Sequence, residues 1–127
     1  MSSPLWIWPG APLRPLCAAD RIVFATPVYW YAMSAPMKML FDRFSDLLRH
    51  EREGRALAGK EIYLLANGAE NELPIGFEVP FQRTADYLRM RYAGCCYVYT
   101  GRNADLREKT RQDLEVFSSN VFGATAV

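Results

Sequence analysis

The stretch ADRIVFATPVYWYAMSAPMKMLFDR, residues 19–43, decides the fold. Its first part, Arg21 to Ala25, is apolar at nearly every position and rich in β-branched and aromatic residues. Such a run predicts a strand that is covered on both faces, as in a parallel sheet. A helix is predicted next, because apolar residues recur at steps of three and four from Met33 to Leu48. Ser34 suits its N-cap and Pro36 its first turn.

The same pair of patterns occurs twice more along the chain. Strand-length apolar runs lie at Ile62–Ala66 and Cys95–Tyr99. Helical stripes follow them at Phe77–Leu88 and Leu106–Val121, and Asn103 or Asp105 is the expected cap of the last helix. The alternation of strand and helix predicts an α/β fold with right-handed crossovers and helices on both faces of a parallel sheet.

Composition limits the classes of protein that the chain can belong to. Its 127 residues suit one domain, and the net charge of +1 without a Lys/Arg block argues against a nucleic-acid partner. Three cysteines without CxxC spacing, and His50 as the only histidine, predict neither a metal site nor a Ser-His-Asp or Cys-His hydrolase. We expect the cysteines to be reduced and buried.

The amino-terminal segment is the least regular part of the sequence. Prolines at positions 4, 9, 12 and 15 interrupt residues 1–16, so we expect that this segment is not a secretory leader. No later run is long enough for a membrane-spanning helix. We therefore expect a cytoplasmic protein with no membrane partner, an irregular segment over residues 1–15 and a domain over residues 16–127.

The loops that follow the predicted strands are the candidate site, because ligands of open parallel sheets bind beyond the carboxyl ends of the strands. Three consecutive aromatic side chains after the first strand could clamp a flat heterocycle, or they could be core or interface residues. Asn67 and Gly68 could line the same pocket or form a simple turn. The candidate cofactor-binding residues are Thr26, Pro27, Val28, Tyr29, Trp30, Tyr31, Asn67 and Gly68.

The same stretch resembles a known family through the pattern A-D-x-I-V-F-x-x-P-V-Y-W-x-x-M-S-A-x-x-K-x-x-x-D-R. It is similar to the flavodoxin-like NAD(P)H-dependent FMN reductases, and the resemblance extends over about residues 16–122. It implies a flavodoxin-like three-layer sandwich with a parallel sheet, of which only the last three strand–helix units are present.

The resemblance also implies a function. FMN would lie at the carboxyl edge of the sheet, with its isoalloxazine held by the loop from Pro27 to Trp30 and lined by Asn67 and Gly68. Hydride would pass from NAD(P)H to the flavin and on to a flavin, quinone or other small acceptor, in a homo-oligomeric enzyme. No catalytic side chain is expected, because the cofactor carries the chemistry.

One departure from the family leaves alternatives open. No Gly/Ser/Thr-rich phosphate loop before a helix occurs in residues 1–20, and the first strand would have a free apolar edge. A non-enzymatic remnant or assembly module that pairs through its open sheet edge is therefore the alternative. An electron-carrier flavodoxin ranks last, because such carriers tend to be acidic and this chain is not.

Overall fold

The computed structural model describes residues 13–48 and 56–123. In chain order its elements are α1 (Leu13–Ala18), β1 (Arg21–Pro27), α2 (Ala35–Leu48), β2 (Glu61–Gly68), α4 (Val79–Tyr87), β3 (Arg91–Tyr99) and α5 (Ala104–Phe122). The predicted alternation of strands and helices is confirmed. His50 and residues 1–12 lie outside the described residues.

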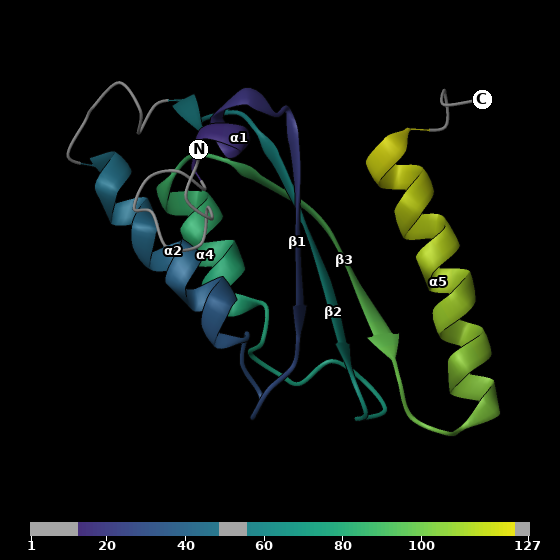
Figure 1. Ribbon diagram of the computed structural model, residues 1–127. Helices are drawn as coiled ribbons and strands as arrows, with labels where there is room; N and C mark the ends of the chain where they lie inside the picture. The colour runs from purple at the N-terminus through teal and green to yellow at the C-terminus, as the bar shows by residue number, and fades with distance from the viewer. Residues whose placement is uncertain (1–12, 49–55, 124–127) are drawn as a thin grey trace, which may run out of the picture.

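The described residues form a three-layer sandwich (Figure 1). Its middle layer is a parallel sheet in the order β1-β2-β3. Helices α1, α2 and α4 lie against one face, and α5 lies alone against the other. Because all three strands run the same way, their carboxyl ends meet at one edge of the sheet, beside the amino-terminal ends of α2, α4 and α5.

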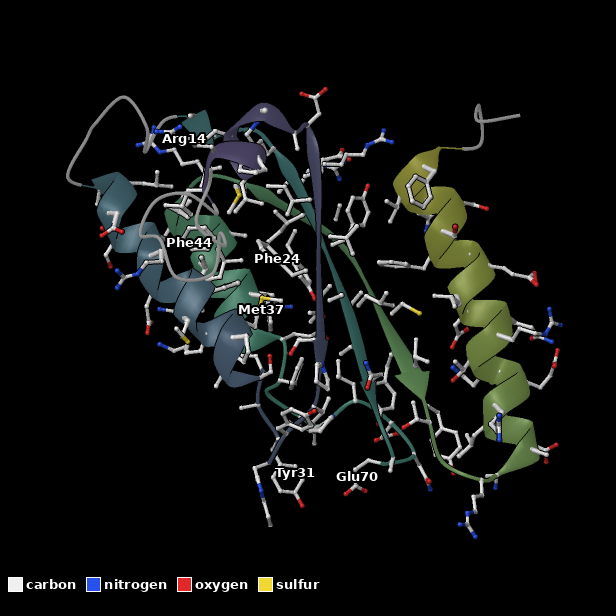
Figure 2. The ribbon with its side chains drawn as sticks, in the orientation of Figure 1. Arg14, Phe24, Tyr31, Met37, Phe44 and Glu70 are labelled. Carbon is white, nitrogen blue, oxygen red and sulfur yellow. The ribbon has the colours of Figure 1, made fainter. Side chains whose placement is uncertain are left out.

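The main core fills the space between the sheet and the layer of α2 and α4. Phe24 of β1 makes an edge contact with Phe41, at 5.1 Å between ring centroids, and Phe41 makes another with Phe81 at 5.1 Å. Figure 2 shows Phe24 and Phe44 pointing into this space from the sheet and from α2. These edge-on contacts add to the burial of apolar area and fix α2 and α4 against the strands.

A second, smaller core lies on the other face, under α5. Tyr63 of β2 meets Phe117 of α5 edge-on at 5.9 Å, and Cys96 and Val121 complete the cluster. This cluster anchors α5 over β2 and β3 and leaves β1 outside its cover.

The continuous apolar run of β1 predicted a strand covered on both faces. This prediction was wrong, because only one face of β1 is covered. Ile22, Phe24 and Thr26 are buried, whereas the residues between them are exposed, with Val23 at 39%. The reason is the position of α5: no helix among the described residues covers the α5 side of β1. The prediction holds for β2, the central strand, in which four of the five residues of the predicted run Ile62–Ala66 are buried.

The outer edge of β1 is also unpaired within the described part of the chain. The Val28 amide donates to Asn67 O at 2.7 Å, and Asp20 O accepts from the Glu61 amide at 3.2 Å. Even-numbered residues therefore bond to β2, and the amides of Val23 and Ala25 point outward.

Two boundaries differ from the sequence-based expectation. Residues Leu13–Pro15 belong to α1, although they fell within the segment expected to be irregular. β3 begins at Arg91, four residues before the predicted run, and its register with β2 shifts between Ile62 and Tyr63. The shift marks a bulge at the start of the strand. The sequence did not indicate this start, because the charged Arg91 interrupts the apolar pattern of the strand. None of the described helices is long and apolar enough to cross a membrane.

Candidate cofactor site at the carboxyl edge of the sheet

The loop after β1 is held in place by a buried threonine. Thr26 is 1% exposed; its hydroxyl donates to Pro27 O at 2.9 Å and accepts from the Ser34 amide at 3.0 Å. The two bonds join the end of β1 to the beginning of α2 across seven intervening residues. Thr26 therefore shapes the loop, and its buried side chain is not available at the surface.

Within this loop, Tyr29 to Ala32 form a tight hairpin. The Tyr29 amide donates to Ala32 O at 2.9 Å, and the Ala32 amide donates to Tyr29 O at 3.1 Å. The two central residues, Trp30 and Tyr31, have φ of 51° and 69°. This left-handed geometry is that of a type I′ turn, which favours Asn and Gly. Two large aromatic residues there carry backbone strain, a feature that clusters at functional sites.

The aromatic side chains of this turn extend into solvent. Trp30 is 92% exposed, Tyr29 61% and Tyr31 64%. Tyr31 lies at the tip of the loop, at the same end of the molecule as Glu70 after β2 (Figure 2). Exposed aromatic rings on a fixed turn can stack on a planar ligand without first leaving a core. The reading of these residues as core aromatics is excluded by their exposure.

The end of β2 supplies the neighbouring wall. Pro27 is the register partner of Asn67, and the Gly68 carbonyl accepts from the Thr100 amide at 2.8 Å. A Cβ at Gly68 would lie 2.8 Å from Tyr97 Oη and 3.4 Å from Val28 Cβ. Glycine thus leaves room for the Tyr97 hydroxyl, which would have to shift if residue 68 carried a side chain.

The structure thus brings most of the predicted site residues together. Pro27 and Val28 lie beside Asn67 and Gly68 on adjacent strand ends, and the aromatic turn begins at the next residue. Tyr97, which sequence reasoning placed in a strand only, also reaches this edge: its hydroxyl donates to Glu70 O at 2.9 Å. The sequence signal that could have placed Tyr97 at this edge is its position two residues before the end of β3.

The described part of the edge fits a flat ring better than a phosphate. Helix α2 is capped by Ser34, whose Oγ accepts from the Met37 amide at 3.4 Å, and α5 by Asn103, whose Oδ1 accepts from the Leu106 amide at 3.1 Å. Helix α4 begins directly after the Glu78 carboxylate. Bound caps and a negative charge oppose a phosphate dianion at these helix ends.

Other side chains weighed from the sequence have structural partners. Lys38 pairs with Asp42 one helical turn on, and Arg43 pairs with Asp46 at 3.8 Å. Cys96 is buried and Cys95 half-buried. Among residues 13–48 and 56–123, no group of three or more His, Cys, Asp or Glu side chains could hold a metal ion.

The fold and this edge define an α/β protein of flavodoxin type with an aromatic loop at the carboxyl ends of its strands. The profile of a family described by its flavodoxin-like fold matches residues 11–119. The chain belongs to this family of flavodoxin-like fold.

Its curated relatives come from Bacillus subtilis strain 168. YwqN, whose name describes an NAD(P)H-dependent FMN-containing oxidoreductase, is 31% identical over 78 residues, 58% of this chain and 43% of YwqN. YrkL, named as an NAD(P)H oxidoreductase, is 38% identical over 88 residues, 58% of this chain and 49% of YrkL. The chain spans about half the length of the curated relatives it matches.

Solved structures agree on the fold. The Trp repressor binding protein of Bacillus subtilis superimposes with a TM-score of 0.74 at 24% identity, over 87% of this chain and 74% of that one. General stress protein 14 of Treponema denticola, in complex with FMN, gives a TM-score of 0.61 at 21% identity, over 90% and 74% of the two chains. At these identities the likeness shows the fold alone.

Proposed function

We propose that this chain forms the isoalloxazine side of an FMN site in an NAD(P)H oxidoreductase of the flavin or quinone reductase type. The observation that carries the proposal is the exposed aromatic hairpin at Tyr29–Ala32, placed by β1 at the carboxyl edge of a flavodoxin-like sheet. Relatives named as NAD(P)H-dependent oxidoreductases support the reaction class. The electron acceptor would be a small planar molecule.

In this proposal the residues of the chain position and shield the cofactor. FMN, when bound, supplies the hydride chemistry. Thr26 keeps the loop in one conformation, and the turn presents Tyr29 and Trp30 to one side of the ring. Gly68 lets the ring approach the end of β2 closely. The rings of the turn would also exclude water from the face that they cover, which strengthens polar contacts to the flavin.

The experiment is a flavin titration of the purified chain Met1–Val127, followed by flavin fluorescence and absorbance. We expect saturable binding with a perturbed flavin spectrum, and bleaching on addition of NADH or NADPH. The variant Tyr29→Ala should weaken binding about two- to twelvefold, because an aromatic stacking contact contributes roughly 0.5–1.5 kcal/mol.

The matched control is Tyr87→Ala. Tyr87 is 72% exposed but ends α4 at the far end of the sheet. Its removal should leave flavin binding unchanged. A folded chain without saturable flavin binding, or equal losses in the two variants, would contradict the proposal.

The alternative of an assembly module has less support. Its motivating feature, the free edge of β1, is present within the described residues, but the curated relatives are named for oxidoreductase activity or as a stress protein. A folded chain that lacks flavin binding and associates through β1 would favour this alternative.

A further inference from the structure

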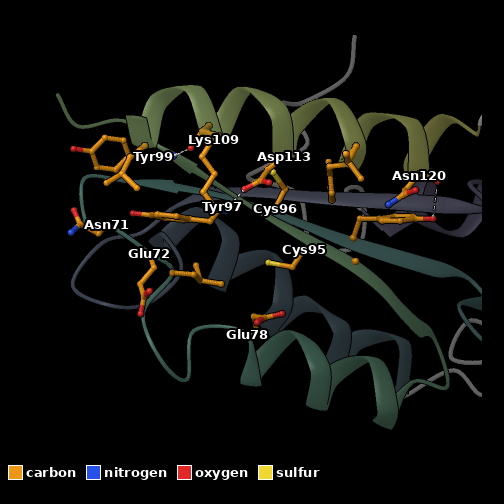
Figure 3. A pocket seen from close by; sticks show the side chains of 17 residues that line it. Asn71, Glu72, Glu78, Cys95, Cys96, Tyr97, Tyr99, Lys109, Asp113 and Asn120 are labelled. Atoms are coloured by element: carbon orange, nitrogen blue, oxygen red, sulfur yellow. Dashed lines mark hydrogen bonds and ion pairs between the residues drawn. The ribbon is translucent and has the colours of Figure 1, made fainter. Parts of the chain in front are cut away.

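A hollow of about 660 Å³ runs along the free edge of β3, apart from the aromatic turn. One wall is α5, and the other is the segment from Asn71 to Glu78 that leads into α4. Figure 3 looks onto it, with Cys95, Cys96 and Tyr97 of β3 between the two walls. The hollow is therefore a groove whose floor is an edge strand.

The backbone of β3 offers hydrogen-bonding groups along this floor. The Thr100 amide donates inward to Gly68 O, whereas the Tyr99 amide donates to Thr110 Oγ1 of α5 at 3.0 Å. Since inward and outward residues alternate in a parallel strand, the N–H and C=O groups of Cys95 and Tyr97 point into the groove. The bulge at the start of β3 and the Thr110 bond at its end limit this straight part to Gly94–Tyr99.

The two walls differ in character. On the α4 side lie the carboxylates of Glu72 and Glu78, of which Glu78 accepts a hydrogen bond from Tyr92 Oη at 2.6 Å. A carboxylate can accept several hydrogen bonds, so Glu78 can take a second donor. On the α5 side, the exposed Val116 provides apolar surface, and the mostly buried Phe117 also lines the wall.

The charged residues of α5 at the groove compensate one another. Lys109 pairs with Asp113 at 2.6 Å between Nζ and Oδ2. The unbalanced charge at the groove therefore comes from the carboxylates of the α4 side.

We propose that this groove binds an extended peptide segment of another protein as an additional strand on β3. Its basic side chains would point toward Glu72 and Glu78, and the alternate small apolar ones toward Val116 and Phe117. The period of two along a strand matches these two walls. Six residues, about 20 Å at roughly 3.3 Å each, span the straight part of the floor.

Charge argues against a second copy of the chain as the occupant. If two β3 edges paired about a two-fold axis normal to the sheet, each wall would meet its own counterpart. Glu72 and Glu78 would then face the same carboxylates of the other copy, and like charges across an interface oppose association. A basic peptide gains from the same carboxylates.

The test uses a fluorescein-labelled hexapeptide of alternating Lys and Val, titrated with the full chain Met1–Val127 and followed by anisotropy. We expect saturable binding that weakens about tenfold in Glu78→Gln, in which the Tyr92 bond can persist but the charge is lost. Glu72→Gln, a change in an exposed loop, should also weaken binding. Glu115→Gln, on α5 but outside the groove, is the matched control and should bind as the parent does.

Two altered peptides test the mode of binding. N-methylation of alternate backbone nitrogens removes the donors for β3 and should abolish binding, and Glu in place of Lys should do the same. Equal binding of the N-methylated peptide, equal weakening by Glu115→Gln, or no saturable binding by the folded chain would overturn the proposal. A dimer that Glu78→Gln strengthens and that excludes the peptide would overturn it in favour of pairing between copies.

Discussion

At the scale of the residue, the aromatic turn concentrates strain that the fold does not need. Trp30 and Tyr31 have left-handed φ values although neither is glycine, and their rings contact mostly solvent. Left-handed backbone costs an L-residue roughly 1–2 kcal/mol. A strained turn that holds two exposed rings is the arrangement that the proposed stacking on a planar ligand would require.

The variant Tyr31→Gly measures how the backbone strain of this turn affects both stability and flavin affinity. We expect the free energy of unfolding to rise by about 1 kcal/mol in denaturant titrations, because glycine adopts the turn without strain, and flavin affinity to fall. The control is Arg89→Gly, since Arg89 also has a positive φ, of 61°, but lies after α4 at the other end of the sheet. It should be stabilised as well, with unchanged flavin affinity; the same loss of affinity in both would argue against a role for Tyr31.

Cys95 shows how burial controls reactivity at a single residue. Burial raises the pKa of its thiol to about 12, and the nearby Glu78 carboxylate adds to the increase. At pH 8 we expect iodoacetamide to modify Cys95 more than about a hundredfold more slowly in the folded chain than in urea, as followed by peptide mass spectrometry.

The raised pKa of Cys95 also makes the stability of the fold depend on pH. The folded chain keeps the Cys95 proton to higher pH than the unfolded chain does. Stability is therefore full below the ordinary thiol pKa and decreases as the pH rises above it. Rapid labelling of Cys95 at pH 8 under native conditions would show that this strand is open in solution.

At the scale of the element, β1 and β3 are the two edge strands of the sheet, and the groups along their outer edges differ. The last outward amide of β3 is bound by Thr110, and charged side chains flank this edge. The Thr110 bond ends the part of β3 that is open to pairing at Tyr99, and the flanking charges restrict which segments can pair with it. On β1 the one charged residue is Arg21, at the start of the strand, and Val23 is exposed beside the open outer edge.

Hydrogen exchange will separate the two sides of β1 residue by residue. We expect the amides of Phe24 and Thr26, which face β2, to exchange slowly, and those of Val23 and Ala25 to exchange at least tenfold faster under native conditions. NMR-detected exchange gives this alternation directly. Uniform protection along β1 would mean that another strand or chain covers its outer edge in solution.

At the scale of the whole molecule, the described residues would provide one side of the proposed flavin site. The aromatic turn and Gly68 suit the ring, whereas the helix ends at the same edge are capped or stand beside a carboxylate. In the proposed site, the ring and the phosphate of FMN would therefore need different parts of the fold, and the described residues would contact the ring.

This separation predicts the ligand preference of the chain. FMN and riboflavin should bind with dissociation constants within about a factor of two, because the phosphate gains no partner. Parallel titrations of the two flavins measure it. Binding of FMN more than tenfold tighter than riboflavin would reveal a phosphate site outside residues 13–48 and 56–123.

The sequence by itself determined the α/β alternation, the parallel sheet and the position of the loop from Pro27 to Trp30. These features rest on local patterns: strand-length apolar runs, helical stripes, the Ser34 and Asn103 caps and a specific motif. Each pattern acts within a few residues, so it can be read before any tertiary contact is known.

Only the tertiary structure decided which surfaces are covered. The run Arg21–Ala25 looks buried on both faces in the sequence, yet α5 lies over β2 and β3 and leaves Val23 exposed. The left-handed turn at Trp30 and the approach of Tyr97 to Gly68 likewise depend on contacts distant in sequence. Burial depends on how the elements pack against one another. An apolar run shows that a strand can be buried, but it does not specify which neighbouring element covers it.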